Sequence, residues 1–146
     1  MPVRNASAIW KGNLKDGKGS MKLGSGAFEG NYSFASRFED GKGTNPEELI
    51  GAAHAGCFSM ALSHILAENG FEPKEVKTSA KVKIEKVEDG FKITSIQLET
   101  EARVPKISRE KFIQYAEDAK KNCPVSQALA GVDITLKANL AQHAMA

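Results

Sequence analysis

The sequence contains only two cysteines, Cys57 and Cys123, among its 146 residues. Two cysteines so far apart make neither a CxxC redox motif nor, by themselves, a four-ligand zinc site. They are also too few for the disulfide framework that holds many small secreted domains together. We therefore expect any disulfide between them to be transient, in a protein of the reducing cytosol.

Long hydrophobic runs and an excess of charge of one sign are also missing. Twenty Lys and Arg residues against eighteen Asp and Glu residues leave a net charge of +2, and the basic residues are spread along the chain. This spread argues against nucleic acid as the main partner. No segment approaches the ~20 uninterrupted apolar residues that span a bilayer, and the N-terminus lacks the features of a secretory signal. We expect a cytoplasmic protein with no membrane partner.

The remaining composition is ordinary for a globular protein. Apolar residues make up 41% of the chain and charged residues 26%, and a chain of this length buries roughly 68% of its unfolded surface. No internal repeat or low-complexity tract is visible. We expect a single domain over residues 1–146.

The first third of the chain is rich in glycine. Turn signals such as Asp16-Gly17 and Gly24-Ser25-Gly26 separate short apolar pieces within residues 11–34, which predicts short antiparallel strands. The segment GSGAFEG lacks the Lys-Ser/Thr ending of a phosphate-binding P-loop, so a turn explains it better than a nucleotide site. Residues 36–46 are predicted to form a loop.

A long helix is predicted over residues 46–69. Asn45 can cap it, Pro46 suits its first position, and Glu48 completes the pattern of a capping box. Asn69-Gly70 is a stop signal. Apolar side chains fall on several sides of this helix, so much of its middle is expected to be buried.

The second half of the chain predicts a hairpin, a helix and a last strand. Residues 76–87 and 91–104 alternate apolar and charged side chains around a turn, which is typical of a hairpin with one wet face. Residues 108–123 form an amphipathic pattern that Pro124 ends. A strand is expected over residues 132–140, and residues 141–146 are expected to fray.

Cys57 stands within the apolar stretch GAAHAGCFSMALSHIL, and two interpretations compete for it. A free cysteine often packs as a small buried hydrophobe. A reactive cysteine must instead form a thiolate, which is costly in apolar surroundings unless a cation lies close by. A functional Cys57 therefore requires a positive charge near its sulfur.

Cys123 lies at a helix break, before PVSQAL, where a new helix can begin. If the two thiols meet, oxidation of one to a sulfenic acid and capture by the other gives a reversible disulfide. Sequence spacing alone leaves open whether they meet.

Two stretches carry a resemblance to a known family. GTNPEELIGAAHAGCFSMALS (43–63) and NCPVSQAL (122–129) resemble the osmotically inducible protein C and organic hydroperoxide resistance protein family (OsmC/Ohr), and HAGCFSMALS is closer to the OsmC branch. The order of the other elements extends the resemblance to nearly the whole chain. It implies an α/β (α+β) fold with curved, mainly antiparallel sheets wrapped around long central helices, assembled as an intertwined homodimer.

The resemblance also implies an activity and a set of site residues. Members of this family are thiol-dependent peroxidases that reduce organic hydroperoxides, linked to oxidative and osmotic stress, with no metal or bound cofactor. The peroxidatic cysteine falls on Cys57, the resolving cysteine on Cys123, the arginine beside the thiolate on Arg37, and the glutamate that pairs with this arginine on Glu47. An external dithiol, suggested by the family to be a dihydrolipoyl group, is the implied reductant.

Physical chemistry agrees with these roles. The permanently charged fork of Arg37 can hold both a thiolate and the Glu47 carboxylate. Moving a thiol pKa from ~8.5 to ~6 corresponds to about 3.4 kcal/mol, a reasonable task for a close ion pair. Ten helical residues separate Glu47 from Cys57, a rise of about 15 Å that one arginine hardly bridges. We hypothesise a two-fold dimer in which Arg37 and Glu47 of one chain complete the site around Cys57 and Cys123 of the other.

In the expected mechanism the Cys57 thiolate attacks the distal oxygen of the hydroperoxide and becomes a sulfenic acid. Cys123 then forms the disulfide, and a dithiol resets it. The alternative function is a non-enzymatic redox sensor or binding module, in which the two cysteines form a switch that a partner reads.

Several neighbouring residues have a structural and a functional interpretation. His54 precedes Cys57 by three residues and can lower the pKa of the thiol or join a metal site, but a buried, hydrogen-bonded packing role is favoured and no metal is expected. Glu47 can instead be only a favourable charge at the helix N-terminus. Phe58 and Met60 can select organic peroxides, although ordinary core packing is favoured for both.

Overall fold

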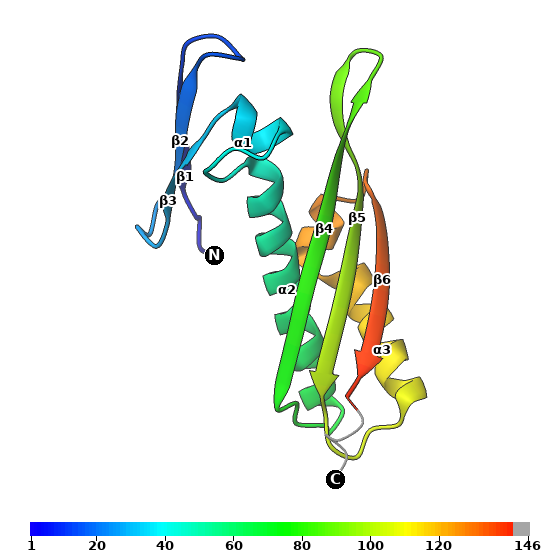
Figure 1. Ribbon diagram of the computed structural model, residues 1–146. Helices are drawn as coiled ribbons and strands as arrows, with labels where there is room; N and C mark the ends of the chain where they lie inside the picture. Colours follow the sequence, from blue (N-terminus) through cyan, green and yellow to red (C-terminus); the bar gives the residue numbers. More distant parts are fainter. Residues whose placement is uncertain (142–146) are drawn as a thin grey trace. The chain divides into compact units, whose positions relative to one another are not determined.

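The computed structural model describes residues 1–141, drawn in colour in Figure 1. The predicted frayed tail therefore lies, except for Ala141, outside the described residues. The chain forms two compact units, Met1–Leu49 (the first unit) and Ile50–Ala146 (the second unit), each with its own sheet. The interpretation of residues 1–146 as a single domain stays a prediction.

The first unit contains a three-stranded antiparallel sheet. Its strands β1 (Ala6–Lys11), β2 (Lys18–Leu23) and β3 (Glu29–Tyr32) follow one another in the order β1-β2-β3. The turn between β2 and β3 uses Gly26 with φ at +81°, a conformation that glycine adopts without strain. The predictions of short antiparallel strands within residues 11–34 and of a turn in GSGAFEG are therefore confirmed for β2 and β3, whereas β1 lies almost wholly before the predicted segment.

A short helix, α1 (Phe34–Phe38), corrects the expectation of a loop over residues 36–46. Ser33 caps this helix, because its hydroxyl accepts from the Ser36 N–H at 3.1 Å while the Ser36 hydroxyl accepts from the Ser33 N–H at 2.8 Å. Five residues are too few for a hydrophobic period to appear in the sequence. Only residues 39–45 of the predicted loop lie outside regular structure.

The long helix α2 runs without a break from Pro46 to Glu68, as predicted. Asn45 caps it by accepting the Glu48 N–H at 2.7 Å. The predicted capping box is only half formed, because the Glu48 carboxylate accepts from the Thr44 hydroxyl at 2.7 Å. Gly70 follows the helix with φ at +87°, in the left-handed region that favours glycine after a helix end.

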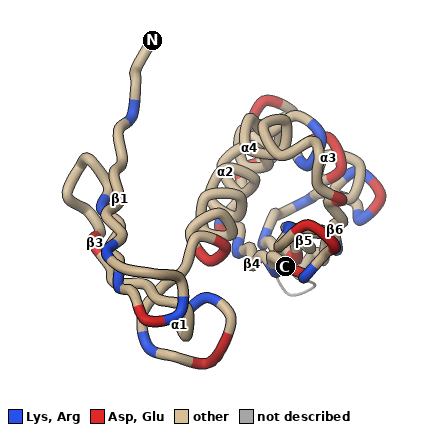
Figure 2. The backbone as a smooth tube through the Cα atoms, turned by 90° about the horizontal axis from the view of Figure 1, so that it is seen from above, with Lys and Arg blue, Asp and Glu red and all other residues tan. Residues whose placement is uncertain are grey.

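The second unit is built on a sheet of three strands in the order β4-β5-β6. β4 (Glu75–Val87) and β5 (Gly90–Arg103) form the predicted hairpin, whose burial alternates along β4, and β6 (Asp133–Leu140) pairs with β5 in parallel. Helices α3 (Arg109–Asn122) and α4 (Pro124–Ala128) complete the unit. Figures 1 and 2 show α2, α3 and α4 on the same face of this sheet.

The core of the second unit lies between these helices and the sheet. One stripe of α2, with side chains four residues apart, supplies Phe58, Leu62 and Leu66, each fully buried. The sheet, the loop after β5, the length of α3 and the cysteine that ends it supply the other fully buried core residues: Ile96, Leu98, Ala102, Val104, Ile107, Phe112, Ala116, Ala119 and Cys123. The core role expected for Phe58 is confirmed.

The expected burial of the middle of α2 on several sides is wrong within one chain. His54, Phe58, Leu62 and Leu66 form a single buried stripe, whereas Met60 is 78% exposed. The core packing expected for Met60 is therefore also wrong, because only one face of α2 meets the sheet. Among residues 1–141, α2 is the one helix long and apolar enough to span a membrane by length and composition, with a mean hydropathy of 1.4. Core helices of soluble proteins pass the same test.

Candidate active site

The structure brings the two cysteine sulfurs together in the second unit. Cys57, on α2, and Cys123, between α3 and α4, are both free thiols whose Sγ atoms lie 3.0 Å apart. Cys123 ends α3 and caps α4, with Pro124 at the first position of the new helix. Cys123 is fully buried and Cys57 is partly buried. This distance places the two thiols within the reach of a disulfide after a small rotation of the side chains.

The surroundings of the two sulfurs make Cys123 the more acidic thiol within this unit. Burial, together with the hydrogen bond to Cys123, raises the pKa of Cys57, against a smaller opposing effect of the Val125 N–H. Burial also acts to raise the pKa of Cys123, but hydrogen bonds from Cys57, Ser126 and Val125 outweigh it and lower that pKa. None of these groups is a cation, so a Cys57 thiolate needs a positive charge from elsewhere.

The other two predicted site residues form a close pair in the first unit. Arg37 of α1 donates from Nε to Glu47 Oε1 at 3.1 Å and from Nη2 to Oε2 at 2.9 Å. Glu47 is only 6% exposed, and a buried carboxylate is stable when paired and hydrogen-bonded in this way. Glu47 is thus more than a favourable charge at the start of α2. The pair uses two of the five guanidinium N–H donors, which leaves three for another acceptor.

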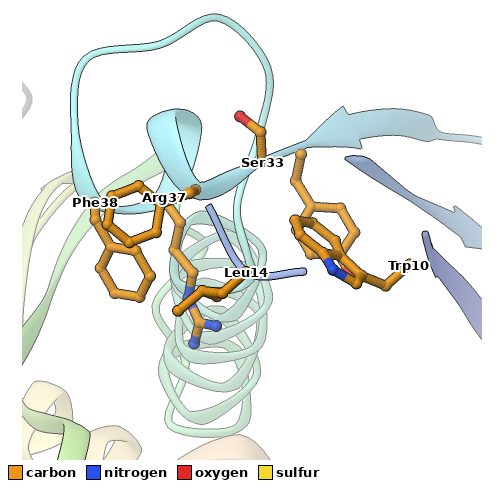
Figure 3. A pocket seen from close by; sticks show the side chains of 7 residues that line it. Trp10, Leu14, Ser33, Arg37 and Phe38 are labelled. Carbon is orange, nitrogen blue, oxygen red and sulfur yellow. The ribbon is translucent and has the colours of Figure 1, made fainter. Parts of the chain in front are cut away.

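Arg37 also lies in an aromatic pocket of the first unit. The pocket has a volume of about 220 Å³ and is lined by Trp10, Leu14, Tyr32, Ser33, Phe34, Arg37 and Phe38. Figure 3 shows the Arg37 side chain beside Leu14, between Phe38 and Trp10. The guanidinium carbon lies 5.2 Å from the centre of the Phe38 ring, within cation–π distance. The pocket therefore joins an apolar wall to a positive charge.

His54 is a buried, hydrogen-bonded residue, as predicted. Its ring is fully buried, and its Nε2 lies 2.7 Å from the hydroxyl oxygen of Ser126 on α4. Burial lowers the pKa of His54. His64, in contrast, lies on the surface and pairs with Glu68 at 3.1 Å. Residues 1–141 contain no group of three or more His, Cys, Asp or Glu side chains arranged to hold a metal ion.

The burial of neutral His54 predicts acid sensitivity. Because its folded-state pKa lies below the ordinary 6.5, the unfolded chain binds more protons at low pH. The stabilisation by neutral His54 is present above pH 6.5 and is lost as the pH falls below that value, at up to about 1.4 kcal/mol per pH unit. Urea unfolding from pH 7.5 down to pH 5 should show this loss, and His54→Gln should remove it. An equal slope in both proteins would contradict the assignment.

Two sets of site residues were not found by sequence reasoning. Ser126 is one such residue: it lies within PVSQAL, and a serine three residues after a helix-capping cysteine is placed to face back toward it. The second set is Phe34 and Phe38, the aromatic residues on either side of Arg37 in SFASRF. Because a loop was predicted from residue 36, the sequence did not indicate that both lie on one helix and pack together.

Comparison with known proteins relates this chain to a family. The model of the family described as OsmC-like protein matches residues 39–137. Peroxiredoxin OsmC of Escherichia coli K12 is 50% identical over 134 residues, which cover 91% of this chain and 93% of the relative. The organic hydroperoxide resistance protein-like 1 of Staphylococcus epidermidis is 32% identical over 105 residues, which cover 70% of this chain and 74% of the relative.

A solved structure extends the agreement to the fold. The organic hydroperoxide resistance protein OhrB of Bacillus subtilis superposes with a TM-score of 0.70 at 27% identity, covering 94% of this chain and 98% of the other. The mixed α and β architecture predicted from the sequence is therefore confirmed. The higher identity to the OsmC relative also agrees with the predicted branch. The chain belongs to the OsmC/Ohr family.

Proposed function

We propose that this protein is a two-cysteine, metal-free peroxidase that reduces organic hydroperoxides to alcohols. The observation that carries the proposal is the pair of free thiols, Cys57 on α2 and Cys123 at the break between α3 and α4, with sulfurs 3.0 Å apart. The names of the relatives, a peroxiredoxin and organic hydroperoxide resistance proteins, support a redox role.

The proposed reaction has three steps. The Cys57 thiolate attacks the distal oxygen of the hydroperoxide, the O–O bond breaks, and the alkoxide leaves as alcohol after taking up a proton, so that Cys57 becomes a sulfenic acid. The Cys123 sulfur then attacks the sulfenic sulfur, the S–O bond breaks and water leaves. An external dithiol, which we propose to be a dihydrolipoyl group, reduces the disulfide and completes the cycle.

Arg37 is proposed to supply the missing positive charge from a second copy of the chain. Within the second unit, burial and Cys123 raise the pKa of Cys57, so the thiolate needs a cation. Arg37 is already held by Glu47, at the start of α2. Because α2 is continuous from Pro46 to Glu68, Glu47 lies about 15 Å along the axis from Cys57. In a two-fold dimer with a shared site, Arg37 of one chain can reach Cys57 of the other while it stays paired with its own Glu47.

The exposed face of α2 supports such a dimer. Ala52, Ala53, Gly56 and Met60 are exposed in the single chain, although the helix is apolar enough to belong in a core. Small side chains allow the close approach of another element, and their burial against a second copy removes apolar surface from water. Sedimentation that finds a fully active monomer would reject the dimer.

The pocket at Arg37 supports an organic substrate. Its aromatic and aliphatic lining provides apolar surface for the alkyl or aryl group of a hydroperoxide, while the guanidinium can face the peroxide oxygens. Hydrogen peroxide has no apolar group that can pack against this lining. The predicted preference is therefore for bulky hydroperoxides over hydrogen peroxide.

A turnover assay tests the proposed function. We expect the protein to consume many equivalents of cumene hydroperoxide or tert-butyl hydroperoxide when dihydrolipoamide is present, and to prefer both over hydrogen peroxide. A single stoichiometric oxidation without recycling by several dithiols would instead favour a redox switch that a partner protein reads.

A further inference from the structure

We propose that His54 is a positioning residue that acts through Ser126 to prepare Cys123 for its attack on the Cys57 sulfenic acid. This inference rests on the proposed function and deepens it. It gives the buried histidine of α2 a role in the second step of the cycle, the closure of the disulfide.

The contacts form a continuous buried path from α2 to the resolving cysteine. His54 Nε2 lies 2.7 Å from Ser126 Oγ, and the Ser126 N–H donates to Cys123 Sγ at 3.4 Å. Cys123 Sγ is in turn 3.0 Å from Cys57 Sγ. His54 and Cys123 are fully buried and Ser126 is 5% exposed. Water therefore does not compete for these hydrogen bonds, which makes each of them stronger.

The protonation of His54 follows from its surroundings. Burial favours the neutral ring, which carries one proton. Nδ1 is buried and has no partner among residues 1–141. A proton on Nδ1 would be a stranded donor, which is rarer and more costly than a lone pair without a partner. The proton therefore belongs on Nε2, which donates it to the Ser126 hydroxyl oxygen.

This direction decides what Ser126 does. When its oxygen accepts from His54, its own hydroxyl proton is free to point at the Cys123 sulfur, whose pKa the Ser126 side chain lowers. Cys123 then receives both the N–H and the O–H of Ser126. Two donors stabilise negative charge on this sulfur and hold it on the side of Cys57.

Closure of the disulfide requires Cys123 to lose its proton and act as a nucleophile. The Cys123 thiol loses its proton, its sulfur attacks the sulfenic sulfur of Cys57, and the hydroxyl group that leaves takes up a proton to form water. Each sulfur ends at the oxidation level of a disulfide. A stabilised Cys123 thiolate speeds the attack, and the same hydrogen bonds stabilise it as the leaving group when a dithiol attacks Cys57 in the reset.

The test separates the two steps of the cycle in single-turnover experiments on the full-length protein. Formation of the sulfenic acid from cumene hydroperoxide is followed by trapping with dimedone, and closure is followed by loss of free thiols. We expect His54→Leu and Ser126→Ala to close the disulfide about tenfold more slowly, the size of effect of one lost hydrogen bond to a charged group. The first step should keep its wild-type rate.

The conservative variants and a matched control exclude a merely structural role. His54→Gln keeps an N–H donor at the same reach and Ser126→Thr keeps the hydroxyl, so both should close within about threefold of wild type, which is less than the loss of one such bond. Leu66→Ala, at another fully buried position of α2, should lose stability without slower closure. If His54→Leu does not fold, Ser126→Ala against Ser126→Thr decides the question.

A second readout does not depend on peroxidase activity. In the Cys57→Ser background, the pH at which iodoacetamide alkylates Cys123 at half its maximal rate should rise when Ser126→Ala or His54→Leu is added. Unchanged closure rates together with an unchanged midpoint would overturn the inference. If wild-type Cys57 is not oxidised by hydroperoxides at all, the proposed function fails, while the alkylation midpoint still tests the network.

Discussion

Replacement of Cys57 by serine is expected to abolish the turnover of cumene hydroperoxide, by at least about a thousandfold. Serine lacks the easily ionised, nucleophilic sulfur that attacks the peroxide oxygen, and removal of a covalent nucleophile typically costs this much or more. The measurement is the consumption of cumene hydroperoxide with dihydrolipoamide as the reductant. Cys57 is only partly buried, and serine is close to it in size, so the fold should survive.

Replacement of Cys123 by serine should give a different defect. Cys57 can still attack one equivalent of hydroperoxide, but its sulfenic acid persists and is open to further oxidation to a sulfinic acid. A Cys123→Ser protein that turns over like wild type would show that the second thiol, although its sulfur is 3.0 Å away, is not needed. Equal loss of the first oxidation in both variants would contradict the separate roles of the two cysteines.

Replacement of Arg37 by methionine is the second large predicted effect. If the guanidinium lowers the pKa of the Cys57 thiol, its loss leaves only the burial and the Cys123 hydrogen bond that raise this pKa, and the thiolate fraction at pH 7 falls. With the orientation of the peroxide also lost, we expect the rate at pH 7 to fall about a hundredfold. The measurement is the rate of Cys57 oxidation against pH.

The pH profile distinguishes this explanation from unfolding. The thiolate is the reactive form, so its rate rises as the pH passes through the thiol pKa, and Arg37→Met should move this rise to higher pH and recover much of the lost rate in alkaline solution. Arg37→Met/Glu47→Gln removes the buried unpaired carboxylate that the single variant leaves. Arg103→Met, at an exposed position of the second unit, should leave the profile unchanged. An unshifted profile in Arg37→Met would exclude the guanidinium as the cause.

Local signals predicted most of the fold. Asn45 and Pro46 defined the start of α2 because capping depends on neighbours within one turn. The alternation in β4 and β5 predicted a hairpin for the same reason, since a strand shows its buried face with a period of two. The parallel pairing of β6 with β5 was not derivable, because it depends on how a distant segment returns to the sheet.

For the candidate site too, residue types were readable from the sequence, whereas contacts between distant segments were not. The chemistry proposed for Cys57, Cys123, Arg37 and Glu47 comes from residue types and family resemblance. The distance of 3.0 Å between the sulfurs was not, because it depends on the packing of α2 against the end of α3. Ser126 was missed because its contact is with a histidine 72 residues earlier in the chain.

The acidity of the two thiols is the most informative difference between sequence and structure. The sequence interpretation required an ionised Cys57, whereas burial and Cys123 raise the pKa of Cys57 within the second unit. Both are compatible when the cation belongs to another chain. In the proposed dimer, a single copy would hold the Cys57 thiol in the protonated form, and assembly would activate it.

A mixed dimer tests this central claim most directly. One chain carries Arg37→Met with its cysteines intact, and the other carries Cys57→Ser with Arg37 intact; at pH 7 each homodimer alone should keep no more than about a hundredth of the wild-type activity. If Arg37 acts on the Cys57 of the partner chain, the mixed dimer has one complete site and should recover about half of the wild-type activity per dimer, as expected for two independent sites. Activity no greater than that of the two homodimers would contradict the account, because it would leave Cys57 without a cation from a second chain.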